Sequence, residues 1–123
     1  MVSTKDWLPL GSVVHIDGYE GFFFIIGYMQ MTESGVWDYA GRPYPMGFMG
    51  EDKDICFNRE DIDGLYYVGY QDVNSVQYQN YLVSQEPLLA KLKQRVAAGE
   101  SVEAILAEQQ AAGAASPVSE NVA

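Results

Sequence analysis

The segment FFFIIGYM, residues 22–29, decides the fold of this chain of 123 residues. It is apolar throughout, so neither of its faces can be left in water. A buried helix could carry the same run, but its short length and its ending in Gly-Tyr favour a strand. We therefore expect the central strand of a curled sheet, with one face in the core and the other covered by a second element.

Shorter strands are predicted on both sides of this segment. SVVHI at residues 12–16 is rich in β-branched residues, and the turn DGYEG joins it to residues 22–29 as a hairpin. In VWDYA at 36–40 the side chains alternate between two faces, which predicts a strand with Asp38 on a solvent-exposed face. The side chains of DICFN at 54–58 alternate in the same way. In NREDIDG, Asn58 is a candidate N-cap of a short helical turn that stops at Gly64, and LYYVGY at 65–70 is the last strand.

The fold class that follows is α+β. About five short strands with tight turns predict a small, strongly twisted antiparallel sheet or an SH3-like barrel, followed by C-terminal helices. We expect an N-terminal arm at residues 1–7, a β-rich domain at 8–71, a helical extension at 72–110 and a flexible tail at 111–123.

The helical extension carries its own start and stop signals. Pro87 predicts a break near Glu86, because the residue before a proline avoids helical geometry. Gly99 is expected to end this helix, and Ser101 can cap a second one. The apolar stripe of the first helix is Leu88, Leu89, Leu92 and Val96, and that of the second is Val102, Ile105 and Leu106.

The charge pattern limits the partners of the protein. The net charge is −10, and thirteen acids face three bases between Asp6 and Glu86. Binding to a nucleic-acid backbone needs clustered Lys and Arg, so we do not expect nucleic acid as a partner. The acidity suits a basic protein partner, and it equally serves solubility alone.

The sequence also bears on the compartment. Cys56 is the single cysteine, so no internal disulfide can form, which is compatible with a reducing cytosol. The N-terminus lacks the basic and apolar regions of a signal peptide, and the longest apolar run is too short to cross a bilayer. We expect a cytoplasmic protein without a membrane span.

The sequence offers few candidate catalytic or metal-binding residues. His15 is the single histidine and lies in an apolar strand, and neither it nor Cys56 belongs to a nucleophile motif. DKDICFNREDID at residues 52–63 has calcium-loop spacing, but Phe57 replaces the required glycine and Asp63 the terminal glutamate. We expect no catalytic residue, no metal and no cofactor, with an enzyme using Cys56 and His15 as the lesser alternative.

Aromatic residues are the remaining functional signal. They exceed what so small a domain must bury, and Tyr and Trp are favoured at protein contacts. The alternative is that helix 73–85 lies across the sheet and covers them. Tyr44 stands between two prolines and is either a pre-organised anchor or a core residue. The candidate partner-binding residues are Trp37, Tyr39, Tyr44, Phe48, Tyr66 and Tyr70.

Four blocks taken in order resemble a known bacterial family, the domain of unknown function 4176. The blocks are LPLGSVVHI, FFIIGY, WDYAGRPYPMG and CFNREDIDGLYYVGYQD, within residues 8–72. The loop MGFMGEDKD is more apolar than the polar loop expected of the family, and the helices from Val73 onward lie outside the resemblance.

The resemblance implies a function, since genes of this family often lie near those of LXG-type toxins secreted by the type VII system. It implies an accessory protein, an adaptor or chaperone, whose partner is such a toxin or the toxin's helical partner proteins. A toxin-neutralising immunity protein is the alternative. The family offers no catalytic residues to transfer to this chain.

Overall fold

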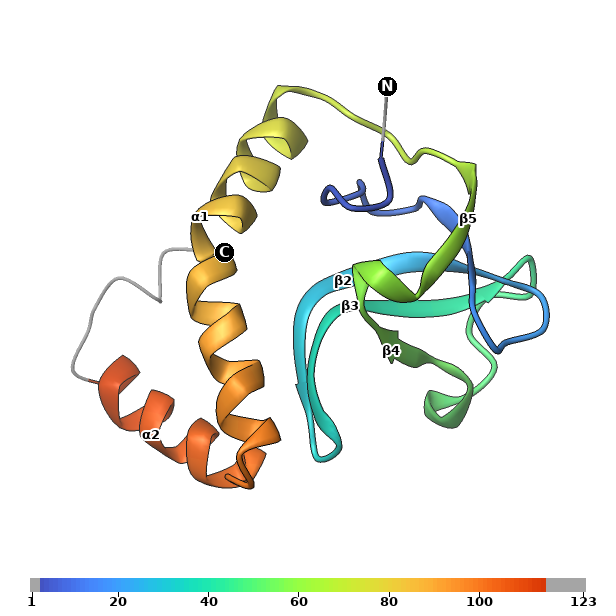
Figure 1. Cartoon of the computed structure of the whole chain (residues 1–123). Helices are drawn as coiled ribbons and strands as arrows, with labels where there is room; N and C mark the ends of the chain where they lie inside the picture. The colour runs from blue at the N-terminus through green and yellow to red at the C-terminus, as the bar shows by residue number, and fades with distance from the viewer. Residues whose placement is uncertain (1–2, 115–123) are drawn as a thin grey trace.

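A computed structural model describes residues 3–114, which form a curled five-stranded sheet with two helices on one side of it (Figure 1). The strands are β1 (Val13–Ile16), β2 (Phe22–Thr32), β3 (Gly35–Tyr44), β4 (Ile55–Phe57) and β5 (Ile62–Tyr67). Two 3-10 turns, η1 (Glu51–Lys53) and η2 (Arg59–Asp61), flank β4, and the helices are α1 (Val73–Ala97) and α2 (Val102–Ala114).

The sheet is antiparallel with the order β4-β3-β2-β1-β5, so β2 is its central strand, as predicted. The β1–β2 hairpin is confirmed, and so is the short helical turn before the last strand. The SH3-like barrel is wrong, because β4 and β5 form the two edges of an open sheet. A bulge between Ile25 and Gly27 breaks the register with β3, and such bulges increase local twist, which helps the sheet to curl without closing.

Strand β3 differs from its predicted form in two ways. It continues past its predicted end at Ala40 to Tyr44. Gly41 is needed for packing, since a Cβ at this position would lie 2.6 Å from the ring of Phe57. Asp38 was expected on a wet face but is only 3% exposed, because cationic side chains from η2 and α1 cover it.

Those side chains form an ion-pair cluster at the junction of β3, η2 and α1. The Asp38 carboxylate accepts hydrogen bonds from the Arg59 guanidinium at 3.2 Å and from the Lys93 ammonium at 2.7 Å. Arg59 also bonds the Glu86 carboxylate at 2.8 Å and lies over the ring of Trp7, 4.2 Å from its centre. Trp7, which we assigned to the N-terminal arm, is buried in the core and donates its indole N–H to Glu86 at 2.8 Å.

The predicted helix break at Glu86 is wrong, because α1 runs without interruption through Pro87. A continuous helix keeps Leu82, Leu89 and Val96 at seven-residue intervals on one face, where Leu82 and Leu89 are buried and Val96 packs against the core. We attribute the continuity to this packing on both sides of Pro87. Leu92 is buried as predicted, whereas Leu88 is 49% exposed and lies off the buried face.

The helix signals at the C-terminal end are confirmed. Gly99 has a φ of 102° just after α1, and the hydroxyl of Ser101 accepts from the Ala104 N–H at 3.1 Å at the start of α2. Val102 and Ile105 are buried, while Leu106 is partly exposed. Helix α2 continues to Ala114, beyond the predicted end at residue 110, and residues 115–123 of the predicted tail lie outside the described part of the chain.

The last strand begins earlier than predicted. Gly64 was expected to stop the helical turn, but it lies inside β5 and pairs with His15 of β1. The turn itself ends at Asp61, whose carboxylate accepts the Asn58 backbone N–H at 2.9 Å. The shift leaves Tyr66 and Tyr67 at the end of an edge strand.

Candidate aromatic docking face

The apolar strand β2 has one buried face and one partly open face. Phe23 and Ile25 belong to the core, whereas the alternating residues Phe22 and Phe24 are only half-buried. The prediction that a second element covers this face is therefore wrong for this part of β2. An aromatic surface on the central strand stays accessible.

Neighbouring strands extend this surface. Phe22 pairs with Tyr44 of β3 and Phe24 with Arg42, so these four side chains share one side of the sheet. On the opposite flank the ring of Tyr66 from β5 lies 4.3 Å from that of Phe22, centre to centre. We call this surface the open sheet face and define it as Phe22, Phe24, Arg42, Tyr44, Phe48 and Tyr66.

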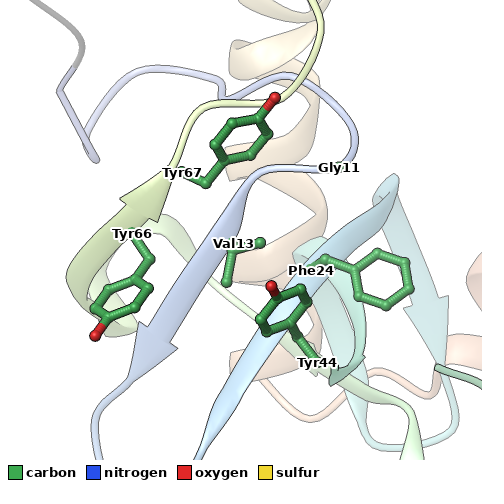
Figure 2. A pocket seen from close by; sticks show the side chains of 6 residues that line it. All are labelled: Gly11, Val13, Phe24, Tyr44, Tyr66 and Tyr67. Carbon is green, nitrogen blue, oxygen red and sulfur yellow. The ribbon is translucent and has the colours of Figure 1, made fainter. Parts of the chain in front are cut away.

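A shallow apolar hollow of about 500 Å³ lies on the open sheet face. Figure 2 shows Val13 of β1 between Tyr66 on one side and Phe24 with Tyr44 on the other. Gly11 and Tyr67 complete the lining. Residues from β1, β2, β3 and β5 thus meet here although they are far apart in sequence, and the hydrogen-bonded sheet fixes their spacing.

Arg42 holds the exposed loop after β3 against this face. Its guanidinium carbon lies 4.9 Å from the centre of the Phe48 ring, and two of its nitrogens bond the Asp54 carboxylate at 2.9–3.2 Å. Met46, Phe48 and Met49 are all more than half exposed. The loop whose apolar character departs from the family pattern therefore adds exposed apolar surface beside Tyr44.

A second hollow of about 630 Å³ lies where the chain passes from β5 into α1. Its apolar lining comes from Leu10, Tyr28, Tyr70 and Tyr78, and Asp72 lines it as well. Leu10 lines this hollow and its chain neighbour Gly11 lines the first, so both hollows adjoin this short segment. Burial raises the pKa of Tyr28 to about 12, and its hydroxyl donates to the Leu8 carbonyl at 2.7 Å.

The structure brings together half of the six residues predicted to bind a partner. Tyr44, Phe48 and Tyr66 are 44%, 60% and 72% exposed and belong to the open sheet face. Tyr70 is exposed and lines the second hollow. Helix α1 leaves Tyr66 and Tyr67 uncovered, so the alternative in which residues 73–85 cover them is wrong.

The other two predicted residues lie elsewhere. Tyr39 is fully buried, and its hydroxyl accepts the Leu8 N–H at 2.7 Å and donates to the Asp6 carbonyl at 3.3 Å, so it is a core residue and cannot contact a partner. Trp37 is half-buried near the β2–β3 turn, where its indole donates to Thr32 at 3.0 Å. Both belong to an alternating strand, but β3 is covered on both sides at this point.

Sequence reasoning missed Phe22, Phe24, Arg42 and Tyr67. The signal for the first two was the alternation within residues 22–29, which we interpreted as burial on both faces. Arg42 gave no signal of its own, because only its pairing opposite Phe24 places it on this surface.

His15 and Cys56 are not brought together. His15 of β1 binds Asp63 of β5 through Nδ1 at 2.5 Å, so it is a strand histidine with a satisfied hydrogen bond. This bond raises the pKa of His15 above its ordinary value. Cys56 lies on β4, with β2 and β3 between its strand and β1, and burial raises the pKa of its thiol.

The acids with calcium-loop spacing also lie apart. Asp54 pairs with Arg42 and Asp63 with His15, while Asn58 caps η2. Within residues 3–114 no three Asp, Glu, His or Cys side chains are grouped so that they could hold a metal ion.

The sequence of this chain matches the model of a known protein family. The model of the family described as Domain of unknown function (DUF4176) matches residues 7–78, more than half of the chain. The chain belongs to this family. The matched region starts at Trp7 and ends inside the first turns of α1, so it contains the whole sheet and all of the open sheet face.

Neither the curated proteins nor the solved structures gave a match to this chain. In the part of the chain that the structure describes, none of the helices has the length and apolar character that a membrane crossing requires.

Proposed function

We propose that this protein is a non-catalytic binding module that contacts a protein partner through the open sheet face. The observation that carries the proposal is the exposure of Tyr44 and Tyr66 beside the half-buried rings of Phe22 and Phe24. Large contiguous apolar surfaces on a soluble domain mark interaction sites, and Tyr is among the residues that contribute most binding energy. Rigid strands hold these rings, so little entropy is lost when they bind.

The partner that we propose is a type VII-secreted toxin of the LXG type, or one of its helical partner proteins, with the present chain acting as a cytoplasmic adaptor or chaperone. The family resemblance supplies this partner, and the acidic body of the protein is compatible with it. The separation of His15 from Cys56 on non-adjacent strands supports a role without catalysis.

The direct test is co-purification with the N-terminal region of a toxin encoded beside the gene. We expect the wild-type protein to recover the toxin region and Tyr44→Ala and Tyr66→Ala each to weaken recovery, because truncation of a central aromatic residue costs about 1–2 kcal/mol or more. Tyr81→Ala is the matched control, since Tyr81 is about as exposed but lies on α1, outside the open sheet face.

Two results would contradict the proposal. Failure of the wild-type protein to recover any toxin region would remove the adaptor role. Survival of cells that express the isolated toxic domain together with this protein would point to the immunity alternative, because an adaptor does not neutralise the toxin.

A further inference from the structure

The open sheet face lies in a strongly acidic part of the molecule. The region matched by the family contains eleven Asp and Glu residues and three bases. Two of these bases are held in ion pairs, Arg42 by Asp54 and Arg59 by Asp38 and Glu86. The third, Lys53, lies in η1, so most of the positive charge near the face is already compensated.

Acidic side chains lie beside the aromatic surface and in the second hollow. Beside the aromatic surface Asp63 binds His15, and the negative charge of Asp17 also favours the protonated form of that imidazole. The His15 ring lies 5.8 Å from the Phe22 ring, which in turn stacks on Tyr66. Asp72 lines the second hollow together with Tyr70.

We propose that the open sheet face binds a basic polypeptide segment in which Lys or Arg residues alternate with aliphatic residues. This inference rests on the proposed function and specifies the chemistry of the partner. The face of an aromatic ring attracts a cation, and an acidic rim attracts the same cation at longer range. An aliphatic side chain of the segment enters the hollow lined by Val13, Phe24 and Tyr67.

Both parts of this chemistry are needed. An apolar segment without charge would use the hollow but not the acidic side chains, and a purely basic segment would leave the apolar lining in water. An acidic segment would meet Asp17, Asp63 and Asp72 and would be repelled. Charge complementarity therefore selects the basic, aliphatic segment among possible protein ligands.

The inference is tested with the full chain and two synthetic peptides. One peptide combines Lys with Leu, and its counterpart has every Lys replaced by Glu. Amide chemical shifts are followed by NMR as each peptide is added. We expect the Lys peptide to shift the amides around Phe24, Tyr44 and Tyr66, with an affinity that falls as salt is added, and the Glu peptide to leave them unchanged.

Variants show which groups are responsible. Tyr66→Ala and the double change Asp63→Asn with Asp72→Asn should each weaken binding of the Lys peptide about fivefold, the scale of a cation–π contact or of a pair of charges. The controls Tyr81→Ala and Glu33→Gln should bind like the wild type, because they change an exposed ring on α1 and an exposed acid at the β2–β3 turn.

Several outcomes would overturn the inference. These are equal binding of the two peptides, no binding of the Lys peptide, or equal losses in the controls and the test variants. A dimer in light scattering that Tyr66→Ala dissociates would assign the face to a second copy of the chain. If the toxin region is recovered through the open sheet face but the Lys peptide does not bind, the proposed function stands and only this inference fails.

Discussion

The backbone N–H of Gly69 donates a hydrogen bond of 2.9 Å to the hydroxyl oxygen of buried Ser12. At this point the chain that leaves β5 crosses directly over the segment that enters β1. A Cβ on Gly69 would lie 2.1 Å from the Leu10 carbonyl oxygen, so the two backbones touch without room for a side chain. This crossing fixes Tyr67 and Tyr70 beside Leu10 and Gly11, and it joins the first and last blocks of the family pattern.

Replacing Gly69 with alanine should destabilise the fold by about 3 kcal/mol, because one of two closely packed backbones has to move. Urea unfolding measures the change. Gly64→Ala is the matched control within β5, where the added Cβ would meet only the Cβ of His15 at an ordinary 3.5 Å. Equal stabilities of the two variants would show that the crossing tolerates a side chain.

The buried carboxylate of Asp38 should make stability depend on pH. Burial acts to raise its pKa, but hydrogen bonds from the Arg59 N–H and the Lys93 ammonium, with the charges of both side chains, outweigh burial and lower it below the ordinary 3.8. The lowered pKa means that the contribution of Asp38 is present above about pH 4 and is lost as the pH falls through the folded-state pKa.

Asp38→Asn therefore should cost about 3 kcal/mol at neutral pH, the lower end of the range for a broken buried ion pair, since Arg59 and Lys93 stay partly exposed. The gap to the wild type should shrink when unfolding is repeated near pH 3, because this pH lies below the ordinary pKa that Asp38 has in the unfolded chain, so that part of its contribution is lost. A gap that keeps its size across this range would show that the ion pairs do not stabilise the fold.

His15 is the single histidine of the chain, so its imidazole gives one resolved titration by NMR. We expect a pKa above 6.5, caused first by the hydrogen bond to Asp63, and a return toward 6.5 in Asp63→Asn. A raised pKa means that the pair stabilises the fold below about pH 6.5 and that this contribution is lost as the pH rises through the folded-state pKa. An unchanged titration in Asp63→Asn would contradict the pairing.

Tyr39 and Tyr66 should respond differently to loss of the hydroxyl. Tyr39→Phe leaves the buried Leu8 N–H without its acceptor and should destabilise the protein by about 1–3 kcal/mol. Tyr66→Phe changes a side chain that is mostly in solvent, so its unfolding midpoint should equal that of the wild type. Comparable losses in thermal unfolding would place Tyr66 in the core as well.

The candidate site could be predicted only in part, for a physical reason that differs between its residues. The sequence predicted Tyr44 and Tyr66 as candidate partner-binding residues and left a core position open for Tyr44, and both side chains are exposed in the structure. It also predicted Tyr39 as a contact residue, since nothing in residues 36–40 shows that Leu8 and Asp6 return to cover that hydroxyl. Phe22 and Phe24 lie in an apolar run, and exposure on one face cannot be distinguished from burial when both faces are apolar.

Local features were determined by the sequence itself. The β1–β2 hairpin, the Asn58 turn, the end of α1 before Gly99 and the Ser101 cap all depend on backbone preferences and hydrogen bonds between residues close in the chain. Such interactions form wherever the same few residues occur, so the pattern of residue types is enough to predict them.

The tertiary structure alone decided which side chains are buried and whether the sheet closes. Helix α1 continues through Pro87 because buried Leu82 and Leu89 lie on the same face, and Asp38 is buried because Lys93 reaches it across fifty-five positions of sequence. Contacts of this kind depend on the relative placement of whole elements, which no local pattern encodes. The open sheet face exists for the same reason, since it is the part of the sheet that neither helix reaches to cover.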